Sequence, residues 1–221
     1  MQIREQTVTP ATGLLRTHTV LRNTYLLLGL TLIFSGFTAW FSVKSNAQPG
    51  IILFLIGAYG LMFLTNALRN SPWGVLSVFA FTGFMGYTLG PILNMFLHKY
   101  LNGAELIMTA LGGTGAIFLS LSIYALTTRK DFSFLSNFIF AGFIVLLIAM
   151  VAGIFIHMPA LQLMISAGFM LFSSAVILFH TGQIIHGGET NYIMATITLY
   201  VALYNLFLSL LQLLAAFSGR D

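Results

Sequence analysis

The sequence predicts an all-α polytopic membrane protein with seven transmembrane helices. Hydrophobic residues make up 58% of the 221 residues and charged residues only 6%, whereas a soluble domain carries about 25% charged residues. A helix that crosses a bilayer needs about 20 mostly apolar residues, and seven segments of the chain meet this requirement. They are residues 23–43, 50–68, 75–97, 105–127, 133–156, 160–185 and 192–217.

The connections between these segments are short, so we expect one compact membrane domain over residues 23–217. Residues 1–22 precede it and are polar, without the apolar stretch that marks a cleaved signal peptide. We therefore expect residues 1–22 to form a flexible cytoplasmic tail. The chain contains no cysteine, which excludes disulfides, thiolate catalysis and cysteine-ligated metals.

The basic residues predict the orientation of the helices. Cytoplasmic loops carry an excess of Lys and Arg, and six basic residues lie on the N-terminal side of the predicted bundle against three on the other side. This predicts a cytoplasmic N-terminus and a periplasmic C-terminus. The net charge of +4 is small and scattered, so we expect contacts with membrane lipids and no nucleic-acid surface. The inner set is Arg4, Arg16, Arg22, Arg69, Arg129 and Lys130; the outer set is Lys44, Lys99 and Arg220.

Glycines in the third segment indicate close helix packing. Gly86 and Gly90 form a GxxxG pair, Gly83 lies one turn earlier, and Pro91 follows. Glycine lets helix backbones approach each other in lipid, where no hydrophobic force drives helices together. Pro91 lacks a backbone donor and is expected to kink the helix. The functional alternative is a gate at this kink.

The junction of the fourth and fifth segments is typical of an anchor at the membrane interface. Arg129 and Lys130 end a predicted helix on the cytoplasmic side, where the helix dipole and anionic lipids both favour cations. Asp131 or Ser133 can cap the helix that follows. This arrangement requires no ligand.

The sixth segment carries one ionisable residue into the membrane. His180 lies five residues before Ile185, about 7–8 Å below the inner end at 1.5 Å per residue. One interpretation is a neutral histidine that is hydrogen-bonded to a neighbouring helix. The other is a pH-responsive group near an inner vestibule, with Gln183 on the same face.

A break follows at residues 186–191. Gly187 and Gly188 are expected to end the sixth helix, and Thr190 or Asn191 to cap the seventh. Glu189 lies where a helix N-terminus favours negative charge. We interpret the segment as a tight inner loop; a lid over an inner cavity is the alternative.

Polar residues of the seventh segment recur at helical spacing and are expected to face the bundle interior. They are Tyr200, Tyr204, Asn205, Ser209 and Gln212. No acidic residue lies in the interior of a predicted segment, since Glu105 stands at the very start of the fourth, whereas proton-coupled transporters and cation channels rely on carboxylates within the membrane. No HExxH or GxSxG motif is present. We therefore expect no catalytic, cofactor or metal site and no enzymatic activity.

Four stretches resemble the Bax-inhibitor-motif family of membrane proteins. They are FTGFMGYTLGPILN at 81–94, TTRKDFSFL at 127–135, ILFHTGQIIHGGETNYI at 177–193 and LYVALYNLFLSLL at 199–211. The resemblance covers essentially the whole chain. It implies a bundle in which the seventh helix is central and the other six surround it.

Some members of that family are pH-sensitive calcium leak channels, in which two aspartates on the sixth and seventh helices share a proton. By the resemblance, these positions fall on His180 and Ala202, and an arginine that pairs with them falls at or beside Arg69. Both carboxylates are therefore missing, and two close acids are needed for a shared proton. A calcium or cation leak through the polar interior around His180 remains the alternative function.

The stretches THTVLRNTYLLL at 17–28 and HGGETNYI at 186–193 are similar to a bacterial branch of the family that modulates the membrane-bound AAA+ protease FtsH in the inner membrane. This similarity implies a regulator without an active site that binds the FtsH complex. An ATP-driven protease engages an unstructured chain end, and we expect residues 1–20 to provide that end. The protein would then be engaged slowly and limit the turnover of other membrane substrates.

Overall fold

The structure is a computed structural model that describes residues 10–156 and 158–218, with side chains described from residue 17 onward. It contains seven helices that are long and apolar enough to cross a membrane, which confirms the predicted all-helical class. Apart from the start of the first helix, each end lies within two residues of its predicted position. The helices are α1 (Pro10–Lys44), α2 (Ile51–Leu68), α3 (Trp73–Lys99), α4 (Gly103–Thr128), α5 (Leu135–Phe155), α6 (Pro159–Ile185) and α7 (Tyr192–Ser218).

The first helix begins much earlier than the sequence suggests. Residues 10–22 are helical and continuous with the first apolar segment, whereas the sequence predicts a helix from residue 23 only. Propagating a helix costs far less than nucleating one, and Pro10 stands at the first helical position, where its missing N–H is not needed. The remainder of the predicted tail, residues 1–9, lies outside the described residues.

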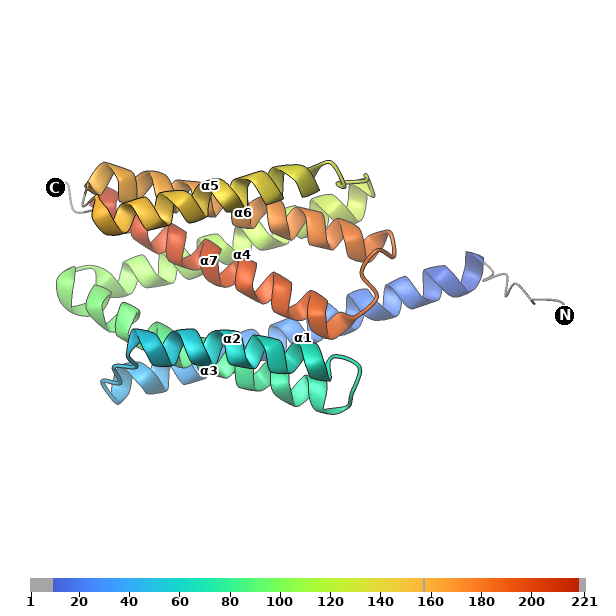
Figure 1. Cartoon of the computed structure of the whole chain (residues 1–221), viewed down its shortest axis with the longest axis horizontal. Helices are drawn as coiled ribbons and strands as arrows, with labels where there is room; N and C mark the ends of the chain where they lie inside the picture. The colour runs from blue at the N-terminus through green and yellow to red at the C-terminus, as the bar shows by residue number, and fades with distance from the viewer. Residues whose placement is uncertain (1–9, 157, 219–221) are drawn as a thin grey trace, which may run out of the picture.

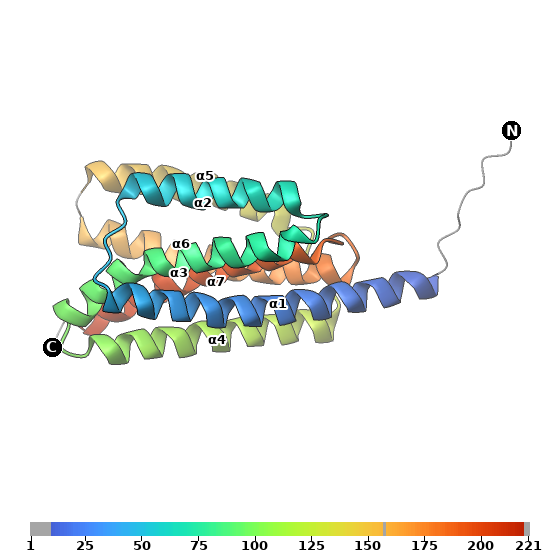
Figure 2. The ribbon, with the colours of Figure 1, turned by 90° about the horizontal axis from the view of Figure 1, so that it is seen from below.

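The helices form three layers, which are most easily followed in Figure 2. The middle layer holds α7 between α3 and α6. One outer layer holds α1 and α4, and the other holds α2 and α5. In this arrangement α7 packs against α1, α2, α3, α4 and α6, whereas α5 packs only against α6.

The hydrophobic core is centred on α7. Leu199, Tyr200, Leu206 and Leu211 of this helix are almost completely shielded. They pack against buried side chains of α1, α3, α4 and α6, among them Leu28, Val78, Phe118 and Ile177. The hydrophobic side chains of α2 and α5 are largely exposed on the outer surface instead.

The predicted glycine packing is present between α1 and α3. A Cβ added at Gly86 would overlap the backbone of Ser35, and one added at Gly90 would overlap Ser42. The two backbones therefore approach each other as closely as small residues allow. The helix α3 is continuous through Pro91 from Trp73 to Lys99.

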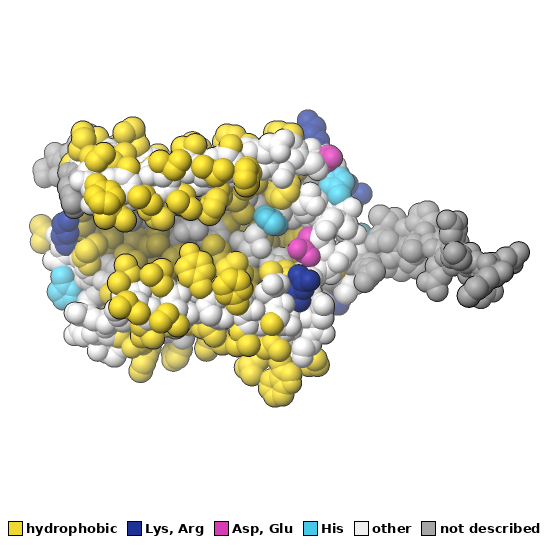
Figure 3. All heavy atoms as spheres, viewed as in Figure 1, with side chains coloured by type: hydrophobic (Ala, Val, Ile, Leu, Met, Phe, Trp, Pro, Cys, Tyr) yellow, Lys and Arg dark blue, Asp and Glu magenta, His cyan; other side chains and the backbone are white. Residues whose placement is uncertain are grey.

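The layer of α2 and α5 is open along its middle. These two helices do not pack against each other, and α5 does not reach α7. The space-filling view shows this face hollowed along the bundle between its two apolar edges (Figure 3). At the end away from the N-terminus, the hollow contains a cavity of about 780 Å³ between α3, α5, α6 and α7.

Candidate functional site

The polar interior expected for α7 is organised around Tyr200, whose side chain is only 2% exposed. Its hydroxyl donates to the backbone oxygen of Thr82 on α3 at 3.1 Å. The single phenolic proton is thereby used, so the hydroxyl of Ser35 on α1 donates to Tyr200 across 2.5 Å. Tyr200 thus joins three helices in the centre of the bundle.

The other polar residues of α7 do not form one continuous site with Tyr200. The ring of Tyr204 lies beside that of Tyr200, tilted by 33° and with 6.4 Å between the ring centroids. Asn205 is half-buried, and its backbone oxygen accepts a bond from Ser209 at 2.8 Å. Gln212 is exposed to the 780 Å³ cavity and accepts a bond from Ser166 of α6 at 2.6 Å. The bond of Gln212 therefore connects α7 to α6, whereas that of Asn205 stays within α7.

His180 is half-buried on α6, and its ring meets the ring of Phe179 edge-on at 5.2 Å. Position 202, where the resemblance places the second acid of the family's pair, is a buried alanine. Glu189 lies in the loop after α6, where its carboxylate accepts from the N–H of Asn191 at 2.7 Å. Among the residues with described placement, no group of three His, Cys, Asp or Glu side chains is arranged to hold a metal ion.

The loop between α6 and α7 has the predicted tight form. Gly187 has a φ of +75°, a conformation that side chains disfavour. Its N–H donates to the oxygen of Ile184 and the N–H of Gly188 to that of Gln183, at 3.2 and 2.9 Å. This pair of bonds is the Schellman pattern that closes a helix C-terminus. Gly188 lies directly on the amide of Gln183, which a Cβ would overlap.

Asn191 connects this loop to two neighbours. Its side-chain oxygen accepts from the N–H groups of Ile193 and Met194 at 3.0 and 3.2 Å, so it caps α7 as predicted. Its side-chain nitrogen donates to the backbone oxygen of Arg69 and the side-chain oxygen of Asn70, both at 3.0 Å. The α6–α7 loop is thereby held to the α2–α3 loop.

His186 makes the corresponding connection to the α4–α5 loop. Its Nδ1 lies 2.9 Å from the oxygen of Gly182 and its Nε2 lies 3.0 Å from the oxygen of Arg129. Both neighbours are acceptors, and a neutral imidazole has one N–H to give. The imidazole therefore donates to one of these two oxygens, and which one depends on its tautomer.

The α4–α5 loop is itself ordered by Asp131. One carboxylate oxygen accepts from the hydroxyl and the N–H of Ser133, at 2.5 and 2.9 Å. These bonds, with a smaller contribution from the charge of His186, hold the pKa of the Asp131 carboxyl below its ordinary value of 3.8. The expected cap is wrong, because α5 begins after Phe134, which has no side-chain cap bond, and Asp131 and Ser133 instead form a turn before the helix. Arg129, at the start of this loop, has a left-handed conformation, and Lys130 follows it.

Arg69 does not pair with the position of the family's acids. Its guanidinium is exposed and donates to Asn66 at 3.3 Å, one turn earlier on its own helix. Its contribution to the site is the backbone oxygen that Asn191 binds. The side chain of Arg69 extends outwards from the end of α2, and among the described residues no acidic side chain in the interior attracts it.

Three loops at the N-terminal end of the bundle therefore form one connected surface, which we call the loop network and define as residues 69–72, 129–134 and 186–191. The sequence placed its charged members on one side of the membrane, but it did not indicate that His186 and Asn191 connect the loops. The available signal was a histidine and an asparagine that flank the glycine pair. Ser35, the partner of Tyr200, had no signal at all.

Comparison with known proteins identifies relatives that match nearly the whole chain. A family model described as "Inhibitor of apoptosis-promoting Bax1" matches residues 17–219. The chain is 58% identical over 211 residues to the "Modulator of FtsH protease YccA" of Escherichia coli strain K12, with 95% of each chain covered. The same identity and coverage hold for the "Inner membrane protein YccA" of Escherichia coli O6:H1. An "Uncharacterized membrane protein" of Vibrio cholerae is 43% identical over 209 residues, covering 94% of this chain and 93% of the relative.

Proposed function

Because the chain belongs to the family of inhibitors of apoptosis-promoting Bax1, we propose that it is a membrane-embedded regulator that binds the FtsH protease and restrains it. The relative that is 58% identical carries the name of a modulator of that protease, and this observation carries the proposal. The described residues agree with a role through contacts, since the polar groups of the interior are engaged in joining helices.

The proposal places the protein in the bacterial inner membrane with the N-terminus and the loop network in the cytoplasm. The six basic residues on this side support that orientation, and a relative of equal identity is named an inner membrane protein. An odd number of helices then places the C-terminus in the periplasm. The loop network would face the cytoplasmic part of the protease.

The proposal also includes the arrangement that the family resemblance implies, with α7 enclosed by the other six helices. The contacts of α7 with five helices support it. Only α5 would have to move towards α7, and its packing against α6 alone leaves it free to do so.

The N-terminal end supplies the segment that the protease would engage. In Figure 1, α1 projects beyond the rest of the bundle at the end that carries the loop network. Energy-dependent proteases grip chain ends that extend from a folded body. Engagement would be slow because the helix that follows is held in the bundle by Val20, Leu27 and Leu28.

The test is co-purification of the tagged protein with FtsH from native membranes in mild detergent. The full chain is compared with deletions of residues 1–9 and 1–16, which stop before the buried Val20. We expect FtsH to co-purify with the full chain, and the deletions to slow degradation of the protein itself. We also expect raised levels of the full chain to slow FtsH cleavage of a second membrane substrate. An unchanged cleavage rate would refute the inhibitory role.

The alternative, a calcium or cation leak, is not favoured by an observation of its own. Ala202 provides no acid opposite His180, and a protonated histidine would repel a cation. Substituting His180→Ala separates the two functions, because a regulator should keep its effect on FtsH whereas a pore should lose its pH response. Calcium flux into vesicles that contain the purified protein measures the second property.

A further inference from the structure

The backbones of α1 and α4 stay apart, although both helices pack against α6 and α7. The seam between them contains two cavities. One, of about 440 Å³, lies near the N-terminal end of α1 and is lined by that helix and by Leu126 of α4. The other, of about 250 Å³, lies deeper between α1, α3, α4 and α7. The rings of Tyr25 and Phe118 meet between the two cavities at 5.7 Å.

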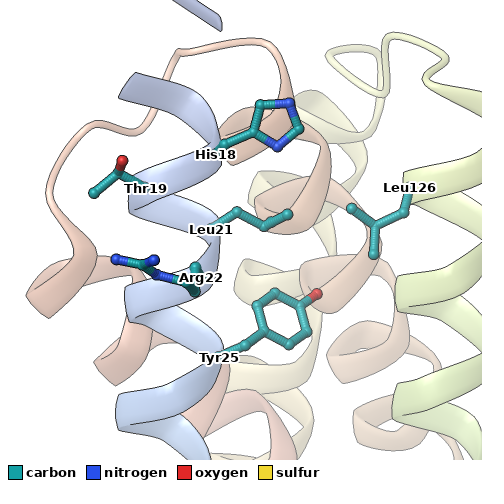
Figure 4. Close-up of a pocket in the computed structure, with 6 residues that line it drawn as sticks. All are labelled: His18, Thr19, Leu21, Arg22, Tyr25 and Leu126. Atoms are coloured by element: carbon teal, nitrogen blue, oxygen red, sulfur yellow. The ribbon is translucent and has the colours of Figure 1, made fainter. Parts of the chain in front are cut away.

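The two cavities differ in chemistry. Figure 4 shows His18, Leu21 and Tyr25 projecting from α1 towards Leu126, while Thr19 and Arg22 project from the other side of the helix. His18 and Arg22 are exposed, so the cavity near the surface has cationic and polar groups at its rim. The deep cavity is apolar apart from the hydroxyl groups of Ser35, Thr114 and the two tyrosines of α7.

The deep cavity is kept open by glycine. Gly36 of α1 and Gly115 of α4 both line it, and a Cβ added at either residue would meet no atom within 4 Å. These glycines therefore do not serve close packing inside the chain, unlike Gly86 and Gly90. They leave the cavity wide enough for a ligand to enter between α1 and α4.

From this geometry we propose that the seam between α1 and α4 binds one phospholipid with an anionic headgroup. The phosphate lies at the rim beside His18, where the exposed side chain of Arg22 has to turn from the other side of α1 to reach it. An acyl chain passes Tyr25 and Phe118 into the deep cavity. The length fits, because ten residues separate Arg22 from Leu32 at the mouth of that cavity, or about 15 Å at 1.5 Å per residue. One leaflet of the hydrocarbon core has about the same thickness. The guanidinium of Arg22 selects an anionic headgroup.

The experiment is native mass spectrometry of the full chain, delipidated in detergent and titrated with phosphatidylglycerol or phosphatidylcholine. Two variants address the cavity. Gly115→Leu fills it, and Gly112→Leu is the matched control, because Gly112 lies on the same helix with equally open space but does not line the cavity. We expect Gly115→Leu to lower the bound phosphatidylglycerol at least tenfold and Gly112→Leu to leave it unchanged.

Two further variants address the headgroup. Arg22→Gln should reduce the preference for phosphatidylglycerol over phosphatidylcholine about fivefold, since a cation at the membrane surface contributes about 1 kcal/mol with anionic lipid. Lys130→Gln removes a cation from the α4–α5 loop, outside the seam, and should not change the preference. Gly36→Leu, on the opposite wall, repeats the cavity test if Gly115→Leu fails to fold. The proposal is overturned if phosphatidylglycerol binds equally well to the wild type, to both cavity variants (Gly115→Leu and Gly36→Leu) and to Gly112→Leu. That result would mean that lipid binds only to the general surface of the protein.

Discussion

Replacing Tyr200 by phenylalanine tests whether the bonds at the centre of the bundle stabilise it. The substitution keeps the ring, which is 2% exposed and meets Phe81 edge-on at 6.0 Å. It removes the donation to Thr82 and the bond from Ser35. A hydrogen bond between membrane helices contributes about 0.6 kcal/mol on average and at most about 1.7 kcal/mol. Two lost bonds therefore predict a loss of about 1 kcal/mol in the free energy of unfolding.

The loss in the free energy of unfolding should stay near the lower end of this range, because the Ser35 hydroxyl can find another hydrogen-bond acceptor. A serine in a helix can turn its hydroxyl to a backbone oxygen of the preceding turn. The assay is reversible unfolding in bicelles, with Tyr59→Phe as the control, since Tyr59 is 59% exposed on α2. The reasoning is refuted if Tyr200→Phe and Tyr59→Phe have equal effects. A loss above about 3 kcal/mol would equally refute it, because it would exceed what two such bonds supply.

Three further predictions follow from backbone conformation, packing and charge. Gly187→Ala should destabilise the protein by roughly 1–2 kcal/mol, because its φ of +75° is unfavourable for a side chain. Gly60→Ala, within α2 and in open space, should not destabilise it in the same unfolding assay. Gly86→Leu should lower the free energy of unfolding by about 1–3 kcal/mol, because the larger side chain forces α3 away from Ser35. Crosslinking between cysteines introduced into α1 and α3 measures this separation. An unchanged crosslinking yield would contradict the prediction. The bonds to Asp131 stabilise the protein at pH values above the ordinary carboxyl pKa of 3.8, and this stability is lost as the pH falls through the lowered pKa. Ser133→Ala should therefore move the pKa of the Asp131 carboxyl upwards in an NMR titration. An unchanged pKa would show that the turn does not form.

Hydrophobic length alone predicted the helices well, because a bilayer requires long apolar segments and the chain contains seven of them. The start of α1 was missed since residues 10–22 are polar, and a polar helix outside the bilayer has no hydropathy signal. The glycines of α3 and the cap at Asn191 followed from local chemistry and are present.

The connections between distant residues could not be predicted in this way. The pairing of Ser35 with Tyr200 joins residues that are 165 positions apart, and that of His186 with Arg129 joins residues 57 apart. Such pairs depend on which helices become neighbours. The seam between α1 and α4 was equally invisible, since an absent contact leaves no pattern in the sequence.

The position of α7 has a consequence for how the protein is made. This helix is the last of the seven in chain order, yet it supplies much of the core and the hydroxyl that joins α1 to α3. During synthesis the first six helices enter the membrane without the element around which they pack. Until α7 arrives, Ser35 lacks its partner on that helix, and the interior is open to lipid. A ribosome that stalls before α7 would therefore leave an unfinished bundle, which a membrane quality-control system can distinguish from the completed protein.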